Sequence, residues 1–204
     1  MLGAHAHRYQ CTLVSESEIA TCEQQLGCAL PEDFRRFLME VGHGTGPYYG
    51  VWGLQPSVQW LQHLAAELAT EEKIEIKPSQ PFPLTGEDLR DIERKVREQS
   101  QHPWAGAKYP NHGSLPICHQ GCIFWSVLVL QGEFAGKVWD VCNPAAHRGQ
   151  WYPARRPPGS MMMRDPAWKA LPPLPRPPTF VEWYSGWIER CLTDLAARRK
   201  LRSR

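Results

Sequence analysis

Residues 30–38 read Leu-Pro-Glu-Asp-Phe-Arg-Arg-Phe-Leu, and this stretch decides the fold of the N-terminal part of the chain. Pro31 suits the first position of a helix, because proline has no amide hydrogen to lose there and its φ is already helical. Glu32 and Asp33 complement the positive end of the helix dipole. The apolar residues that follow recur at helical spacing: Phe34, Phe37, Leu38 and Val41. The stretch therefore predicts a short amphipathic helix that ends at Gly42.

A second helix is predicted immediately before this one. Ser15 and Glu18 have the spacing of a capping box, in which the serine hydroxyl and the glutamate carboxylate satisfy each other's backbone amides. The apolar residues Ile19, Cys22 and Leu26 follow at helical spacing. Gly27 then ends the helix, so the chain should begin with two helices joined by a short turn.

The middle of the chain predicts an antiparallel sheet. Residues 122–131 are β-forming and nearly all apolar, which is typical of a central strand. A glycine-containing loop over 132–136 returns the chain into a partner strand over 137–141. Short strands are also expected at 50–54 and 115–117. The predicted fold class is therefore α+β, with a mainly antiparallel sheet flanked by N- and C-terminal helices.

Three further helices are expected. One covers 57–72, with an apolar face made of Val58, Leu61, Leu64, Ala65 and Leu68. A highly charged one covers 85–101, with a buried stripe made of Leu89, Ile92 and Val96. A second capping box, Thr179 to Glu182, begins the last helix. Its apolar stripe comprises Trp183, Trp187, Ile188, Cys191, Leu192 and Leu195.

The 204 residues predict a single domain that spans 1–204 and is long enough to bury a core. The core should comprise about 15–142 and 179–195. Residues 143–178 are rich in proline and include three consecutive methionines, so we expect an excursion over the surface with little helix or central strand. Residues 196–204 form a basic tail.

Charge and cysteine content indicate the compartment and the partners. Residues 1–147 hold 11 Lys/Arg and 17 Asp/Glu, whereas 148–204 hold 12 and 4. The basic end lacks interleaved aromatic residues, so a solvated helix end is favoured over a nucleic-acid interface.

No apolar run is long enough to span a bilayer and no secretory signal is present. Seven cysteines without paired CxxC spacing fit a reducing compartment, which places the protein in the cytoplasm.

Further segments accompany the two N-terminal helices. They are Gly-His-Gly-Thr-Gly-Pro-Tyr-Tyr-Gly at 42–50, Leu-Pro-Ile at 115–117 leading through Gly121 and Cys122 into 124–131, Gly-Lys-Val-Trp at 136–139, and Phe-Val-Glu-Trp-Tyr-Ser-Gly-Trp-Ile at 180–188. In this order and spacing the chain resembles the SUKH superfamily, which includes yeast Smi/Knr-type cell-wall regulators and bacterial toxin-immunity proteins.

This resemblance implies a function that no single site in the sequence carries. Bacterial members of this kind are immunity proteins, each of which binds the toxic domain of a cognate effector and blocks its active site or its access to substrate. The expected protein is thus a non-enzymatic inhibitor with a protein partner, no cofactor, no metal, no nucleic acid and no membrane. The alternative is a regulatory interaction module of the Smi/Knr type, with Pro172–Pro178 as a docking ligand in polyproline conformation.

Aromatic residues in predicted loops are the candidate partner-binding residues, because aromatic and arginine side chains dominate interface hot spots. The candidates are Tyr48, Tyr49, Trp104, Tyr109, Trp151, Tyr152, Arg155 and Arg156. The alternative is that these aromatic side chains attach proline-rich loops to the body of the protein.

Catalytic and metal-binding patterns are weak by comparison. Cys118, His119 and Cys122 could supply a zinc site with His112 or Cys142, but side chains diverge along a strand and the spacing is not that of a structural zinc site. A thiolate nucleophile at Cys118 has no orienting carboxylate nearby in sequence. The glycines at 42, 44 and 46 lack the lysine of a phosphate cradle. The acidic residues Glu87, Asp88 and Asp91 alternate with basic ones, which is typical of a charged surface helix.

Overall fold

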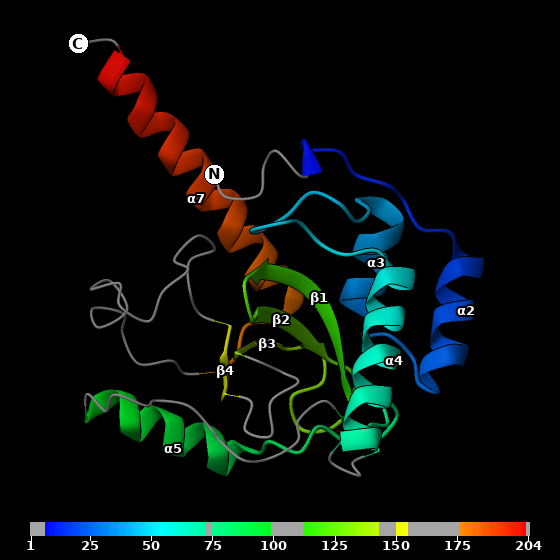
Figure 1. Cartoon of the computed structure of the whole chain (residues 1–204). Helices are drawn as coiled ribbons and strands as arrows, with labels where there is room; N and C mark the ends of the chain where they lie inside the picture. Colours follow the sequence, from blue (N-terminus) through cyan, green and yellow to red (C-terminus); the bar gives the residue numbers. More distant parts are fainter. Residues whose placement is uncertain (1–6, 72–74, 99–111, 143–149, 155–175, 203–204) are drawn as a thin grey trace.

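The structure is a computed structural model that describes residues 7–71, 75–98, 112–142, 150–154 and 176–202 (Figure 1). The helices are α2 (Glu16–Leu26), α3 (Glu32–Glu40), α4 (Leu54–Glu71), α5 (Gly86–Arg97) and α7 (Phe180–Arg202). The strands are β1 (Ser114–Gly121), β2 (Phe124–Val129), β3 (Val138–Cys142) and β4 (Gln150–Pro153).

The four strands form one sheet in the order β1-β2-β3-β4, and every neighbouring pair is antiparallel. The helices α2, α3, α4 and α7 share a buried apolar core with one face of the sheet. The opposite face packs against α5 and the segment before it. Figure 1 shows this arrangement, with α5 on the far side of the sheet from α3 and α7. The predicted α+β class is confirmed.

The alternation of side chains along β2 separates the two cores. Leu128 and Leu130 belong to the larger core, where they share buried surroundings with Ile19, Phe34 and Phe180. Val127 and Val129 point the other way, into the smaller core with Trp139 and Trp151. Because both faces of β2 are covered, its nearly continuous apolar sequence is explained by a position inside the sheet.

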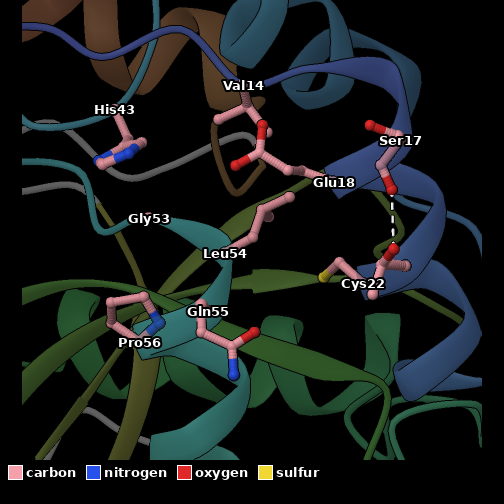
Figure 2. A pocket seen from close by; sticks show the side chains of 10 residues that line it. Val14, Ser17, Glu18, Cys22, His43, Gly53, Leu54, Gln55 and Pro56 are labelled. Carbon is pink, nitrogen blue, oxygen red and sulfur yellow. Dashed lines mark hydrogen bonds between the residues drawn. The ribbon is translucent and has the colours of Figure 1, made fainter.

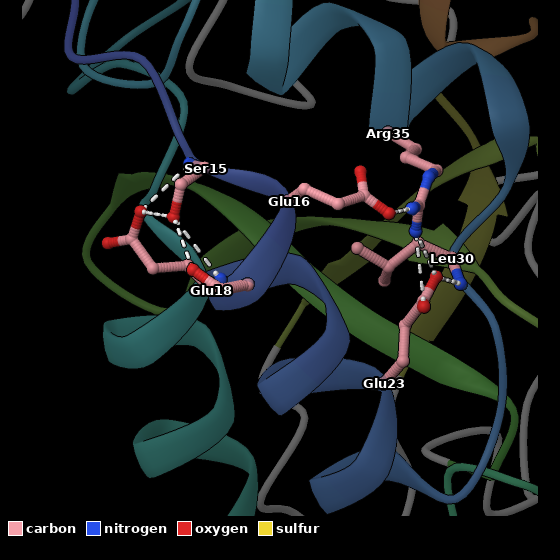
Figure 3. A network of polar contacts seen from close by, with 7 residues as sticks. Ser15, Glu16, Glu18, Glu23, Leu30 and Arg35 are labelled. Carbon is pink, nitrogen blue, oxygen red and sulfur yellow. Dashed lines mark hydrogen bonds and ion pairs between the residues drawn. The ribbon is translucent and has the colours of Figure 1, made fainter.

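The predicted N-terminal helix pair is present, and Figure 3 shows how its members are joined. The capping box is complete: Glu18 N donates to Ser15 Oγ, and Ser15 N donates to Glu18 Oε2 at 2.8 Å. Gly27 caps the helix C-terminus in the left-handed conformation, with φ of 70°. The Arg35 guanidinium of α3 bridges to Glu16 and Glu23 of α2. Glu23 also accepts from the Leu30 amide at 2.9 Å, so one carboxylate fixes the turn between the helices.

Two details of α3 differ from the prediction. Pro31 is the N-cap residue rather than the first helical residue, with φ −55° and an extended ψ of 134°. Val41 caps the C-terminus and is 43% exposed, so the buried part of the predicted stripe is carried by Phe34 and Leu38. Phe37 is half-buried against the larger core.

The set of strands needs two corrections. Residues 50–53 are irregular, because helix α4 starts at Leu54 and leaves room for only one backbone hydrogen bond to β1, from Trp52 N to Ile117 O at 2.8 Å. Conversely, β4 lies inside 143–178, where only a surface excursion was expected. Its central residues Trp151 and Tyr152 are strong β-formers, and both are buried.

The remaining helices match the predicted ones only in part. Helix α4 buries the predicted apolar face. It starts at Leu54, before the predicted start at residue 57, because the first turn of a helix tolerates a proline such as Pro56. Helix α5 buries Leu89 and Ile92, as predicted. Val96 was predicted to be buried with them, but its side chain is not among those the structure describes. On α7 the stripe is only half buried: Trp183 and Trp187 face the core, whereas Ile188, Leu192 and Leu195 are exposed.

The glycine-rich loop between α3 and α4 turns tightly, and its glycines serve the backbone geometry of the turn. Gly42 and Gly44 have φ of 92° and 111°, values that L side chains rarely adopt. Gly50 has φ of 95°, and a Cβ there would lie 1.7 Å from the carbonyl oxygen of Gly44. Only glycine at position 50 allows the two ends of this loop to meet.

Candidate partner-binding surface

Five rings from separate parts of the chain form a continuous surface aromatic cluster. It consists of Tyr49, Trp52, Trp60, His119 and Trp125. The Trp125 ring is central, with ring centroids 4.3 Å from His119, 4.5 Å from Trp60 and 4.8 Å from Trp52. Tyr49 stacks on His119 at 5.6 Å and is 41% exposed, while the other four rings are half-buried. The cluster therefore combines fixed ring positions with a solvent-facing edge, as interface anchors do.

The sheet register and the α3–α4 loop bring these rings together. His119 and Trp125 are direct partners in the β1–β2 pairing, so their side chains emerge on the same face of the sheet. Tyr49 and Trp52 lie in the loop before α4, and Trp60 lies on α4 itself. Helix α4 packs along β1, which places Trp60 beside that strand pair.

Backbone strain occurs at two points beside the cluster. Tyr48 and Cys122 both have positive φ, at 52° and 51°, although neither is glycine. The residues that follow them, Tyr49 and Ile123, are 41% and 44% exposed. Positive φ at a residue other than glycine costs energy and occurs often at functional sites. In both places the unusual backbone presents the next apolar side chain to solvent, and the His119 Nε2 bond to Cys122 O at 3.0 Å fixes the second turn.

The structure places the predicted partner-binding residues in three different settings. Tyr49 is on the surface and belongs to the aromatic cluster. Tyr48, Trp151 and Tyr152 are at most 4% exposed, which corrects their expected surface position, because they pack inside the molecule and stabilise it there. The remaining four, Trp104, Tyr109, Arg155 and Arg156, lie outside the described residues.

Sequence reasoning missed four members of the cluster. Trp125 falls in the predicted central strand over 122–131, His119 was weighed as a possible zinc ligand, and Trp52 and Trp60 were not singled out as partner-binding residues. The available signal was the period of β2, in which Trp125 and Val127 share one face. Nothing local in the sequence indicates that this face is open at its Trp125 end.

A buried polar cluster, made of Gln120, Ser126 and Asp140, lies on the other face of the sheet. Asp140 Oδ1 accepts from Gln120 Nε2 at 2.6 Å and from Ser126 Oγ at 2.7 Å. All three side chains are at most 3% exposed. Ser126 and Asp140 are direct partners in the β2–β3 register, so a shift of either strand by one residue would separate donor from acceptor.

The Cys118 thiol beside this cluster is not arranged as a nucleophile. Its Sγ donates to Pro47 O at 3.2 Å, and the residue is completely buried. Burial raises the pKa of the Cys118 thiol well above its ordinary value, and Asp140 raises it further. His119 lies on the opposite face, against Trp125, so it cannot act as the base for Cys118. Among the residues with described positions, no group of three His, Cys, Asp or Glu side chains could hold a metal ion.

This arrangement predicts the order in which the thiols react. In the native protein at mildly alkaline pH, the exposed thiols of Cys11 and Cys122 should be alkylated first. Cys118 should react only on unfolding, and so should Cys22, whose pKa is raised to about 12 by burial. Peptide mass spectrometry after timed labelling measures this order. Early modification of Cys118 would contradict it and would reopen the thiol-enzyme alternative.

A cavity of about 300 Å³ lies between α2 and the first turn of α4 (Figure 2). Glu18, Cys22 and His43 are its titratable lining groups. The Glu18 carboxylate is already bonded to Ser15, and these bonds lower its pKa. Burial lowers the pKa of His43, with a smaller opposing effect from Glu18. The carboxylate is thus held ionised by its structural role, which does not suit a general acid near neutral pH.

The chain is an α+β protein with an aromatic cluster that reaches the surface at Tyr49. The chain belongs to the SMI1 / KNR4 family (SUKH-1), whose model matches residues 13–154. Members of this family are generally non-catalytic. The match contains all four strands and the whole aromatic cluster, and it ends before α7. The part of the expected resemblance at 179–195 lies outside it.

No curated protein and no solved structure matches the chain. Within the described parts of the chain, none of the helices combines the length and the apolar character that a membrane span requires.

Proposed function

We propose that this protein is a cytoplasmic immunity protein, which binds the toxic domain of a cognate bacterial effector and blocks its active site or its access to substrate. The observation that carries the proposal is the surface aromatic cluster, in which Tyr49 is exposed and rests on half-buried rings that hold it in position. Membership of the SMI1 / KNR4 family supports a role in protein interaction.

Inhibition would come from tight surface complementarity. A stable complex buries roughly 800 Å² on each partner, and a few central aromatic side chains supply most of the binding energy. The aromatic cluster provides such a centre, with Ile123 beside it on the β1–β2 turn. Because the rings contact one another in the free protein, little side-chain entropy is lost when a partner covers them.

The test is co-expression with a toxic effector domain encoded beside this protein. The unchanged protein should restore growth and co-purify with the toxin. A Tyr49→Ala/Ile123→Ala double variant should bind at least about tenfold more weakly, since hot-spot truncations commonly cost more than 1 kcal/mol. Titration calorimetry measures the affinity, and circular dichroism checks that the variant is folded.

Leu13→Ala is the matched control, because Leu13 is 60% exposed and is not part of the aromatic cluster. It should bind the toxin like the unchanged protein. Toxin binding that is unaffected by the double variant would show that another surface is used. Failure of the unchanged protein to bind or to protect would contradict the immunity role and would favour a regulatory interaction module.

A further inference from the structure

The segments that build the surface aromatic cluster contain no lysine or arginine. Residues 41–71, which include Tyr49, Trp52 and Trp60, hold two glutamates and no basic residue other than histidine. Residues 112–131, which include His119 and Trp125, hold no Asp, Glu, Lys or Arg. The whole chain has 23 lysine and arginine residues, so their absence from both segments leaves the cluster without an ammonium or guanidinium group of its own.

The Tyr49 ring has one face that the cluster does not cover. Its other face stacks on His119, with an interplanar angle of 24° and a centroid distance of 5.6 Å. Because Tyr49 is 41% exposed, the face turned away from His119 is accessible to a partner. The face of an aromatic ring is its electronegative part, and it attracts a cation most strongly when water is displaced from the contact.

Glu67 places a carboxylate on the same side of α4 as Trp60. The two residues are seven positions apart, which is close to two helical turns, so they lie about 10 Å apart along the helix. Glu67 is half-buried, and among the described residues no basic side chain forms an ion pair with it. The carboxylates of Glu23 and Asp91, by contrast, already have basic partners. Glu67 is therefore open to a basic group from another protein.

We propose that the aromatic cluster binds an arginine side chain of the toxic domain, whose guanidinium stacks on the accessible face of Tyr49; the identity of the partner rests on the function proposed above. Arginine fits better than lysine, because a planar guanidinium stacks on a ring and is less strongly hydrated than an ammonium. Basic residues beside that arginine would be attracted to Glu67. The excess of acidic residues in 1–147, 17 Asp/Glu against 11 Lys/Arg, favours the same basic partner surface.

NMR titration of the full chain with a synthetic peptide tests the arginine contact without the toxin. The probe is a blocked hexapeptide of sequence Gly-Arg-Gly-Ser-Arg-Gly, and the control peptide has citrulline in place of both arginines, which keeps the shape of the side chain and removes its charge. The arginine peptide should shift the backbone and indole signals of Tyr49, Trp60 and Trp125, with a midpoint roughly in the millimolar range expected of so small a ligand. The citrulline peptide should leave these signals unchanged at the same concentration.

Variants of Tyr49 separate stacking on the ring from simple apolar contact. Tyr49→Leu keeps apolar area without a ring and should weaken binding of the arginine peptide at least about threefold. Tyr49→Phe keeps the ring and should bind the peptide more tightly than Tyr49→Leu does. Leu13→Ala, at an exposed position outside the cluster, should bind like the unchanged protein. Glu67→Gln should weaken binding about twofold, because one attractive charge is lost.

Three results would overturn the arginine contact: equal shifts with the citrulline peptide, equal affinities of Tyr49→Leu and Tyr49→Phe, or shifts confined to acidic residues away from the cluster. Because the peptide experiment contains no toxin, it fails separately from the immunity function. A toxin that is neutralised while the arginine peptide leaves the cluster unchanged would reject the arginine and keep the immunity role. Peptide binding at the cluster without protection by the protein would reject the immunity role and assign the arginine site to a different partner.

Discussion

Replacing Phe34 by alanine is expected to lower the free energy of unfolding by about 3–5 kcal/mol, the usual cost of truncating a buried phenylalanine. Phe34 is 1% exposed, and its ring contacts Phe180 at a centroid distance of 4.7 Å and Phe37 at 6.5 Å. The substitution would leave a cavity between α3 and α7, where the surrounding aromatic rings cannot close in without leaving their own contacts.

Urea denaturation followed by circular dichroism measures this effect, and Val41→Ala is the matched control. Val41 belongs to the same predicted stripe of α3 but is 43% exposed, so its truncation should cost less than about 0.5 kcal/mol. Equal effects of the two substitutions would show that α3 does not dock as described.

Asp140→Ala should destabilise the protein by roughly 2–4 kcal/mol, the second large effect we expect. The substitution removes the acceptor shared by Gln120 and Ser126. Gln120 Nε2 keeps its bond to Ser126 Oγ at 2.8 Å, but the Ser126 hydroxyl loses its acceptor inside the sheet, where water cannot replace it. Asp140→Asn keeps a side-chain oxygen in the same place and should cost much less. Chemical denaturation distinguishes the two variants.

If the alanine and asparagine variants were equally unstable, the effect would come from loss of the negative charge and not from loss of the acceptor. A neutral outcome for Asp140→Ala would contradict a role for the buried polar cluster in fixing the strand register.

Local features of the fold were predictable because their causes are local. The capping boxes at Ser15 and Thr179 each need two residues three positions apart, and both are present, with Thr179 N donating to Glu182 Oε2 at 2.7 Å. The hairpin between β2 and β3 was likewise predicted from an apolar run, a glycine-rich turn and a second run. Each prediction depended on residues that are close together in the sequence.

Predictions failed where distant parts of the chain decide the outcome. The periodicity of α7 identified its apolar face but could not show that the body ends near Trp187, which leaves Leu192 without cover. Strand β4 is only four residues long and lies in a proline-rich stretch, so its pairing with β3 outweighs the local composition. The aromatic cluster draws on four separate segments, and its geometry follows from the register of β1 and β2.

The docking of α7 on α3 has a consequence for biosynthesis. The sheet order follows the chain order, so its strands can pair as they emerge from the ribosome, whereas α7 emerges after all of them. Until it arrives, Phe34 and Phe37 lack the Phe180 ring that covers them in the finished protein. Nascent chains that have completed the sheet but not α7 should therefore be the species that chaperones bind and that aggregates most readily.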